Sequence, residues 1–330
     1  MKRLLARVLV GVAVGVAIYV GFSIWADARS VGRALERFSW SWAVLALGLA
    51  AGNYLVRFVR WHYYLRVIDV AVPLGESFLV FLGGFALTVT PGKLGEAVKA
   101  LLLRQSRGVP AARTAPIVIA ERFTDLVGLL LLAAVGAFTF EVDRTFLVLA
   151  AALIAGGLLF VSVTPLAHFG LDLLARLPGL KRLAPKLREF YASTRTLLHP
   201  APLGLAVVLS VVSWYLECLA FWLVVGGFPG ADIGHQPAVF IYAAMTIAGA
   251  LSFLPGGLGV TEAGMLALLV SLGTGIGRGT AAAATFVTRL CTLWFAVAVG
   301  LLALLVFVRK THVAVELPTP GEGPKAAPTP

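Results

Sequence analysis

The chain has 330 residues, of which 59% are hydrophobic and 13% are charged, and its mean hydropathy is +0.93. Too few charged side chains remain to solvate a globular surface, which excludes a soluble domain and predicts an all-α, polytopic membrane protein. The formal net charge is +11, but the basic residues adjoin apolar runs, so the expected partners are membrane lipids with anionic headgroups and not nucleic acid. Cys218 and Cys291 both lie inside apolar runs, where neither a disulfide nor a zinc site is expected.

Six apolar stretches are long enough to cross about 30 Å of hydrocarbon as helices. They cover residues 8–25, 40–58, 114–140, 145–164, 202–225 and 280–308. The first follows Lys2 and Arg3, as a signal peptide would. Its apolar run is longer than the roughly 7–15 residues of a cleaved signal, so we expect a retained span.

One motif occurs twice and interrupts an apolar run each time. The first copy is Pro91-Gly92-Lys93-Leu94-Gly95-Glu96, and the second is Pro255-Gly256-Gly257-Leu258-Gly259-Val260-Thr261-Glu262. The two prolines are 164 positions apart, about half the length of the chain. Each turn joins two short arms, residues 77–90 with 94–104 and residues 238–254 with 261–273, which predicts two re-entrant hairpins. Backbone groups freed at such a break must be buried in protein or line a wet cavity.

The basic residues favour a topology with both termini in the cytoplasm, because cytoplasmic loops carry an excess of Lys and Arg. With the N-terminus inside, 20 basic residues fall on the cytoplasmic side, five fall outside and two lie within spans. Three spans then separate the hairpins, which places the hairpins on opposite sides. We therefore expect two inverted repeats, residues 1–142 and 143–310, each with three spans plus one re-entrant Pro-Gly hairpin. An alternative topology counts the hairpin arms as crossing helices.

Two segments are expected outside the hydrocarbon core. Residues 166–199 carry Leu and Phe at helical spacing among Lys and Arg, which predicts an amphipathic helix on the cytoplasmic leaflet. Residues 311–330 are rich in Pro, Gly and Ala, and a disordered tail is predicted. The expected location is the bacterial inner (plasma) membrane.

Charged residues at membrane depth are candidates for substrate binding, because each is unfavourable there unless it is paired or hydrated. Glu121, Arg122 and Asp125 lie together in the third span, with Glu121 and Asp125 on one helix face and Arg122 able to pair with Asp125. The alternative is a helix-end cluster that snorkels to the interface.

Arg289 lies in the middle of the last apolar run, at the position equivalent to Arg122. We expect either an ion pair with Glu262 or Glu217, or contact with an anionic substrate. Glu217 is isolated in the fifth span, and Arg289 is the first candidate for its partner. The second span ends in residues for which an aromatic and basic belt at the interface is the expected role: Asn53, Arg57, Arg60 and Trp61.

Glu96 and Glu262 each follow a Pro-Gly turn, near the first turn of the second arm. One explanation is that they cap the helix N-terminus. The same N–H groups could instead receive a phosphate, with Lys93 and Lys99 nearby. The residues of the turns are expected to allow tight turns and close helix approach rather than to bind a ligand: Pro91, Gly92, Gly95, Pro255, Gly256, Gly257 and Gly259.

Catalytic signatures are absent from the sequence. It contains no H-E-x-x-H, no G-x-S-x-G and no Walker lysine loop, and its five histidines lack the spacing of metal ligands. We therefore expect no enzyme activity, no cofactor and no metal site.

The two Pro-Gly motifs, together with Glu121-Arg122-Phe123-Thr124-Asp125 and Arg289, resemble the lysylphosphatidylglycerol synthase transmembrane family, also called flippase-like domain proteins. The resemblance covers nearly all of residues 1–310. The family includes the membrane half of the bacterial multiple peptide resistance factor, which moves aminoacylated phosphatidylglycerol between leaflets. In the two-part proteins a soluble aminoacyl-transferase domain follows the membrane region, and none is expected here after Lys310.

The residues and the resemblance together predict an integral membrane translocase, flippase-like, for a lipid or a lipid-linked headgroup that is anionic. The polar site would lie between the inverted repeats and include the hairpin glutamates, Arg122 and Arg289. The alternative is a non-catalytic membrane scaffold that binds a lipid intermediate or recruits a glycosyltransferase or lipid-modifying enzyme through the basic segment 166–199. A third alternative is an intramembrane transferase.

Overall fold

The computed structural model describes residues 2–25, 27–89, 94–137, 148, 152 and 184–311. All named elements in these ranges are helical. Their one extended pairing is an isolated antiparallel bridge between Asp232 and Thr274. The prediction of an all-α chain is therefore confirmed for the described residues.

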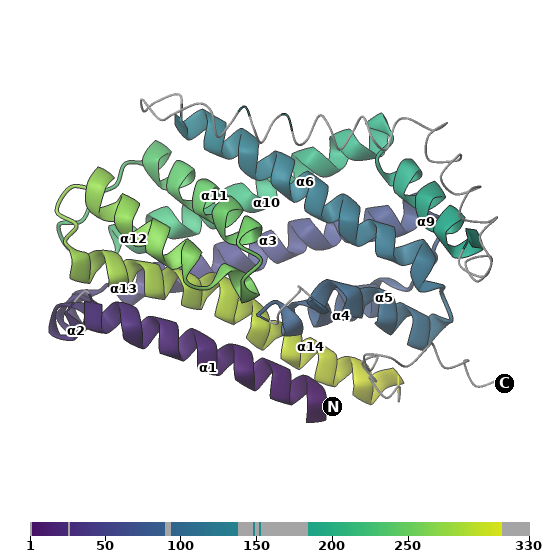
Figure 1. The fold of residues 1–330 in the computed structure, drawn as a ribbon, viewed down its shortest axis with the longest axis horizontal. Coiled ribbons are helices and arrows are strands. Elements are labelled where there is room, and N and C mark those ends of the chain that lie inside the picture. Colours follow the sequence, from purple (N-terminus) through teal and green to yellow (C-terminus); the bar gives the residue numbers. More distant parts are fainter. Residues whose placement is uncertain are drawn as a thin grey trace.

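Figure 1 shows how the described helices are arranged. Those of the first half of the chain are α1 (Lys2–Trp25), α2 (Ala28–Arg37), α3 (Trp40–Val67), α4 (Leu74–Gly83), the 3-10 turn η1 (Gly84–Leu87), α5 (Leu94–Arg107) and α6 (Ala111–Ala137). Those of the second half are α9 (Ala184–Leu197), α10 (Pro200–Gly226), α11 (His235–Leu251), the 3-10 turn η3 (Pro255–Gly257), α12 (Val260–Leu272), α13 (Arg278–Arg289), the π-turn η4 (Leu290–Trp294) and α14 (Phe295–Thr311).

Four helical runs in the described ranges are long and apolar enough to cross a membrane: Trp40–Val67, Pro200–Gly226, Pro255–Leu272 and Arg278–Thr311. The first, second and fourth correspond to predicted spans, and the fourth joins α13, η4 and α14. The third is a predicted hairpin arm together with its turn, so the re-entrant hairpin stays a prediction. The protein is a membrane protein with several apolar helices.

Helices also form over the predicted spans 8–25 and 114–140, as α1 and α6. Other predictions fall outside the described residues. These are nearly all of the span 145–164, the turn Pro91-Gly92-Lys93, the repeat boundary at 142/143, most of the segment 166–199 and the tail after Thr311. Of the amphipathic segment, the structure describes α9 and the two residues that follow it.

Local sequence signals account for several helix starts. The Asp27 carboxylate accepts a hydrogen bond from the Arg29 backbone N–H at 3.3 Å and caps α2. Pro200 is the first residue of α10, where the missing N–H has no intrahelical role and the fixed φ suits the helix. The helices α2 and α10 therefore have start signals that can be read from the sequence.

Most long helices run along the long axis of the molecule (Figure 1). The elements from the two halves of the sequence interleave, since α3 packs along α10, and α6 packs against both α10 and α11. The helices next to the Pro-Gly motifs are separated along this axis. Figure 1 shows α4 and α5 toward one end, and α11 and α12 toward the other.

Two apolar cores lie along the molecule. One gathers side chains of α10 to α13, including Phe221 and Leu269. The other gathers side chains of α3, α4 and α14, including Trp61 and Phe307. The cavity of the candidate site is lined by residues that belong to both cores.

Candidate functional site

A polar stripe on α3 contributes the first part of the site. Asn53, Arg57 and Arg60 follow one another at helical spacing and therefore face the same side. Asn53 and Arg60 are completely buried, and so is Trp61. The prediction of a basic and aromatic belt at the membrane interface is wrong, because α10 and α6 cover this face of α3. The Asn53 amide, for example, donates to the Ser213 carbonyl of α10 at 2.7 Å.

Asp125 of α6 is the counter-charge for this stripe. Its carboxylate lies 2.7 Å from Arg60 Nη1 and 3.2 Å from Arg57 Nη2. The hydroxyl of Ser210 on α10 donates a third contact at 3.0 Å. Three helices are thus joined at one carboxylate that is 3% exposed. We name the group formed by Asp125, Arg57, Arg60 and Ser210 the Asp125 network.

Glu121 lies one turn before Asp125 and is also buried. It forms an ion pair with Lys99 of α5. The Lys99 ammonium additionally lies 4.5 Å from the centroid of the Trp61 ring, a cation–π geometry. Glu121 and Asp125 therefore share a buried face, as their spacing predicts, and the alternative in which they snorkel to the interface is wrong.

The second half of the chain supplies a separate charge pair. Arg289 Nε donates to the Glu262 carboxylate at 2.6 Å, and Arg289 Nη2 donates to the Gly256 carbonyl at 2.6 Å. The other Glu262 oxygen accepts from the Gly259 N–H at 2.7 Å, so Glu262 also caps α12. The Tyr19 hydroxyl of α1 lies within 3.4 Å of Glu262. Of the two predicted ion-pair partners for Arg289, the structure selects Glu262.

The backbone around this pair is irregular on both sides. Gly256, Gly257 and Gly259 have φ of 61°, 67° and 90°, a region that glycine adopts without steric strain. A Cβ on Gly257 would lie 2.7 Å from Thr261 Oγ1, so the turn also requires a small residue for close approach. On the other side, the π-turn η4 begins directly after Arg289. Such turns are frequent at functional sites.

Glu217 of α10 is buried and accepts a hydrogen bond from the Tyr242 hydroxyl of α11 at 2.5 Å. The prediction that Arg289 pairs with Glu217 is wrong, because Arg289 is directed to the turn and to Glu262. Tyr242 is 25 positions away in sequence, and only the packing of α10 against α11 brings it to the carboxylate.

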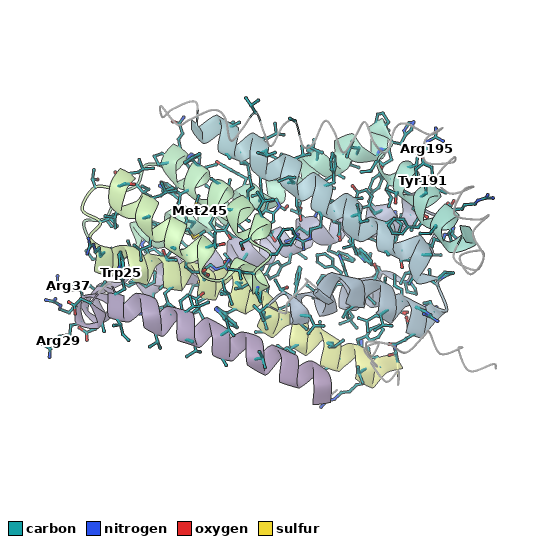
Figure 2. The ribbon with its side chains drawn as sticks, viewed as in Figure 1. Trp25, Arg29, Arg37, Tyr191, Arg195 and Met245 are labelled. Carbon is teal, nitrogen blue, oxygen red and sulfur yellow. The ribbon has the colours of Figure 1, made fainter. Side chains whose placement is uncertain are left out.

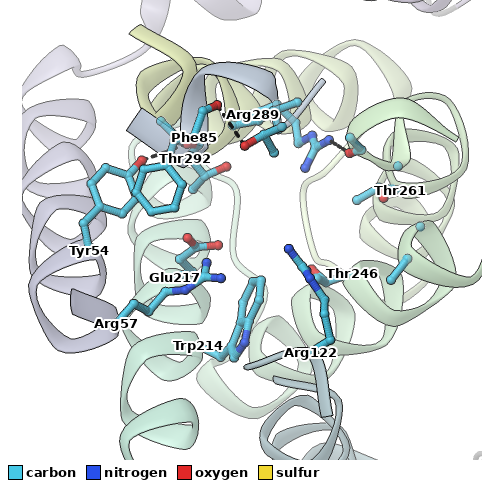
Figure 3. Close-up of a pocket in the computed structure, with 18 of the residues that line it drawn as sticks. Tyr54, Arg57, Phe85, Arg122, Trp214, Glu217, Thr246, Thr261, Arg289 and Thr292 are labelled. Carbon is cyan, nitrogen blue, oxygen red and sulfur yellow. Dashed lines mark hydrogen bonds between the residues drawn. The ribbon is translucent and has the colours of Figure 1, made fainter. Parts of the chain in front are cut away.

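These groups surround one cavity of about 160 Å³ (Figure 3). A single water needs only about 10–15 Å³, so the space suits several waters or a small headgroup. Figure 3 shows the side chains of Arg57, Arg122 and Trp214 projecting into the hollow. Its lining includes four cations and one carboxylate: Arg57, Lys99, Arg122, Arg289 and Glu217.

The lining residues come from both halves of the chain. Tyr54, Phe85 and Thr88 belong to the first half, and Thr246, Thr261 and Thr292 to the second. Trp214 Nε1 and Arg57 Nε are buried donors that have no hydrogen-bond partner among the described residues. Buried donors are almost always satisfied in native proteins, so water or an anion is expected at these two atoms.

The structure brings most of the predicted site residues together. Lys99, Arg122, Glu217 and Arg289 line the cavity, and Glu121, Asp125 and Glu262 hold its cations from behind. Lys93, Pro91 and Gly92 lie outside the described residues, and Glu96 and Gly95 lie on α5, with the Glu96 side chain outside the described set. Among the residues that the structure describes, no cluster of three or more His, Cys, Asp or Glu could hold a metal.

The sequence analysis did not predict that Arg57 and Trp214 line the cavity. For Arg57 a signal existed, since its spacing from Asn53 and Arg60 defines a polar face too regular for a belt at a helix end. Trp214 lies in an apolar run, and nothing in its spacing distinguishes it from a lipid-facing or core tryptophan.

Comparison with known proteins identifies membrane proteins that are similar to this chain. A UPF0104 membrane protein of Methanothermobacter thermautotrophicus is 28% identical over 305 residues, which cover 84% of this chain and 86% of the relative. A UPF0104 membrane protein of Pyrococcus horikoshii is 22% identical over 304 residues, covering 84% and 90%. The family described as Lysylphosphatidylglycerol synthase TM region matches residues 10–300. The match includes every described residue that lines the cavity, and the chain belongs to this family.

Proposed function

We propose that the protein moves a lipid, or a lipid-linked headgroup, across the membrane by binding its anionic group in the cavity between α3, α6, α10 and α13. The observation that carries this proposal is the lining itself. Four cationic side chains from both halves of the chain face one hollow, inside a protein with four helical runs apolar enough to cross a membrane among the described residues. Polar residues at membrane depth that line a cavity commonly mark a substrate pathway.

An anion fits the charges better than a cation or a neutral group. Around the cavity there are five cations, Arg57, Arg60, Lys99, Arg122 and Arg289, against four carboxylates, Glu121, Asp125, Glu217 and Glu262. Three of the carboxylates lie behind the cations as ion-pair partners, so the side exposed to a ligand is mainly positive. Guanidinium groups also match phosphate oxygens geometrically, which favours a phosphate-bearing headgroup.

In this proposal the headgroup crosses the membrane between two inverted repeats. The helices next to the two Pro-Gly motifs lie toward opposite ends of the molecule (Figure 1), as antiparallel halves would place them. The helix α12 by itself has 13 residues, about 20 Å at 1.5 Å per residue, and the run Pro255–Leu272 reaches spanning length only when the glycine turn η3 and the residues up to Gly259 are counted with it. A re-entrant hairpin that ends at the cavity accounts for this length. In the proposed topology of two inverted repeats, both termini are cytoplasmic and the membrane is a bacterial inner membrane.

The proposal requires no chemical conversion of the lipid, and acyl chains would remain in the bilayer while the headgroup passes. The decisive measurement is leaflet-specific labelling of fluorescent phosphatidylglycerol in proteoliposomes. We expect Arg289→Ala and Glu262→Gln to slow the movement at least about tenfold, because each leaves the other charge of a buried pair without its counter-charge, a loss that typically costs about 2 kcal/mol or more. Trp214→Phe keeps an aromatic side chain, smaller than the indole, and removes one unpartnered donor, so it should weaken transport with little effect on folding.

Leu302→Ala is the matched control, because Leu302 is 64% exposed on the lipid-facing side of α14. It should transport at the wild-type rate. If correctly inserted Arg289→Ala and Glu262→Gln proteins moved lipid as fast as wild type, the proposed site would be wrong. A scaffold that only binds a lipid intermediate, or recruits a glycosyltransferase, predicts no protein-dependent lipid movement even in wild type.

A further inference from the structure

A second hollow lies apart from the central cavity, between α1 and α12. Its volume is about 710 Å³, and its walls are apolar with a single charged residue. On α12 the exposed residues Ala263, Ala267 and Val270 recur at helical spacing and form one wall. On α1, Ile18, Gly21 and Trp25 form the other wall. We name this hollow the α1–α12 groove.

The groove has the length of one bilayer leaflet. From Gly259 to Val270 it follows α12 for 11 residues, about 16 Å at 1.5 Å per residue. Half of a hydrocarbon core of roughly 30 Å is similar. Small side chains along the wall leave room for a chain of methylene groups, and none of the groove residues on α12 is polar.

The charged residue lies at one end of the groove. Arg278 begins the long apolar run Arg278–Thr311, so it stands where a membrane-crossing helix leaves the hydrocarbon. Its guanidinium lies 5.1 Å from the centroid of the Trp25 ring. Figure 2 shows Trp25 at the same end of the molecule as Arg29 and Arg37, which fits an interfacial position. Arg278 is exposed and makes no salt bridge within the described ranges.

The opposite end of the groove adjoins the second charge pair. Gly259 lines the groove and donates its N–H to Glu262, which pairs with Arg289 at the wall of the central cavity. Tyr19 on α1 contacts Glu262 from the same side. One turn of backbone and one tyrosine therefore separate the groove from the cavity.

We propose that the α1–α12 groove binds one acyl chain of an anionic phospholipid, with the lipid phosphate at Arg278 beside Trp25. The groove supplies an apolar slot of leaflet length, and the arginine supplies a charge at headgroup level that has no carboxylate partner among the described residues. The lipid would be held directly beside the cavity that receives headgroups, and this last step rests on the proposed function.

The test uses phosphatidylglycerol with a photoactivatable diazirine in its acyl chain, incorporated with the full chain into phosphatidylcholine vesicles. After illumination, mass spectrometry maps the labelled residues. We expect labelling concentrated at residues 18–25 and 263–270. Arg278→Gln should reduce the preference for phosphatidylglycerol over the same probe on phosphatidylcholine by about fivefold, the ratio expected for one basic residue near the membrane surface.

Ala267→Trp fills the groove and should abolish this labelling. Leu302→Trp places the same bulk on the exposed face of α14 and should leave it unchanged. Equal labelling of all lipid-facing helices, or full labelling in Ala267→Trp, would overturn the proposal. Because binding is measured without transport, failure of the groove leaves the effect of the Arg289 and Glu262 variants intact, and the converse also holds.

Discussion

The Asp125 network and the Glu262–Arg289 pair both hold arginines at the cavity, but they are built on different backbones. The network joins three continuous helices, α3, α6 and α10, through Asp125. The pair lies between a turn with three glycines of positive φ and the π-turn η4. Arg289 also donates to a carbonyl of that turn, Gly256, so its position depends on how the turn is folded.

This difference assigns distinct roles to the two regions. Regular helices have no spare backbone groups, and a carboxylate that joins three of them resists displacement. A glycine turn and a π-turn can change conformation with less loss of hydrogen bonding, because each already departs from the helix ladder. We therefore expect the Asp125 network to act as a fixed support and the Glu262–Arg289 pair to be the part that moves when a headgroup binds.

Replacing Asp125 gives the largest expected loss of stability. In Asp125→Ala, Arg57 and the fully buried Arg60 lose their counter-charge, and removing one partner of a buried ion pair typically costs about 3–5 kcal/mol. Thermal unfolding of the purified protein in detergent measures the loss. Ser210→Ala is the matched control, since it removes one hydrogen bond to the same carboxylate and leaves both ion pairs in place, so it should cost less, about 1.5–3 kcal/mol. If Asp125→Ala and Ser210→Ala lost the same thermal stability, the charge of Asp125 would not be what stabilises the contact between the three helices.

Gly249→Ala tests how closely α11 packs on the glycine turn beside the Glu262–Arg289 pair. Its Cβ would collide with Thr261 Oγ1 and lie 3.3 Å from Gly257 Cα, so α11 and the turn must separate. Overpacking of this kind costs about 1–3 kcal/mol. Gly204→Ala on α10 has open space around the added methyl group and should be neutral or slightly stabilising. Thermal unfolding of both variants checks the prediction, and a stable Gly249→Ala protein would show that the turn is not tightly packed.

The sequence predicted the region around the Glu262–Arg289 pair better than it predicted the Asp125 network. Pro-Gly motifs and an arginine in the middle of an apolar run are local signals, and they identified the glycine turn, Glu262 and Arg289. The roles of Arg57 and Arg60 depend instead on which helices cover α3, and a helix end next to Trp61 has the same composition in an interfacial belt as in a buried network. The Glu217–Tyr242 contact shows the same limit of spacing rules, because it requires the packing of α10 on α11.

Tyr54 connects the two regions, and its loss should have a smaller effect. Its hydroxyl, on α3, donates to the Thr292 carbonyl in η4 at 3.0 Å. Tyr54→Phe removes this hydrogen bond, which should cost about 1 kcal/mol. We expect faster hydrogen exchange at Leu290–Trp294 and unchanged exchange at Asp125. Unchanged exchange in both segments would mean that α3 does not restrain the π-turn.

The smallest expected effect lies outside the cavity, at the contact between α4 and α5. Arg107 Nε donates to the Glu76 carboxylate at 2.9 Å, and this hydrogen bond lowers the pKa of Glu76 below its usual value. A carboxyl group whose pKa is lower in the folded state stabilises the fold above its unfolded pKa, and this stabilisation disappears as the pH falls through the folded pKa. The thermal stability of wild type should therefore exceed that of Glu76→Gln at neutral pH, and the difference should vanish in acid.

Because Arg107 is exposed, added salt should reduce the difference at neutral pH. If the difference in thermal stability did not depend on pH or salt, the contact between Glu76 and Arg107 would stabilise the packing of α4 on α5 through side-chain contact and not through charge.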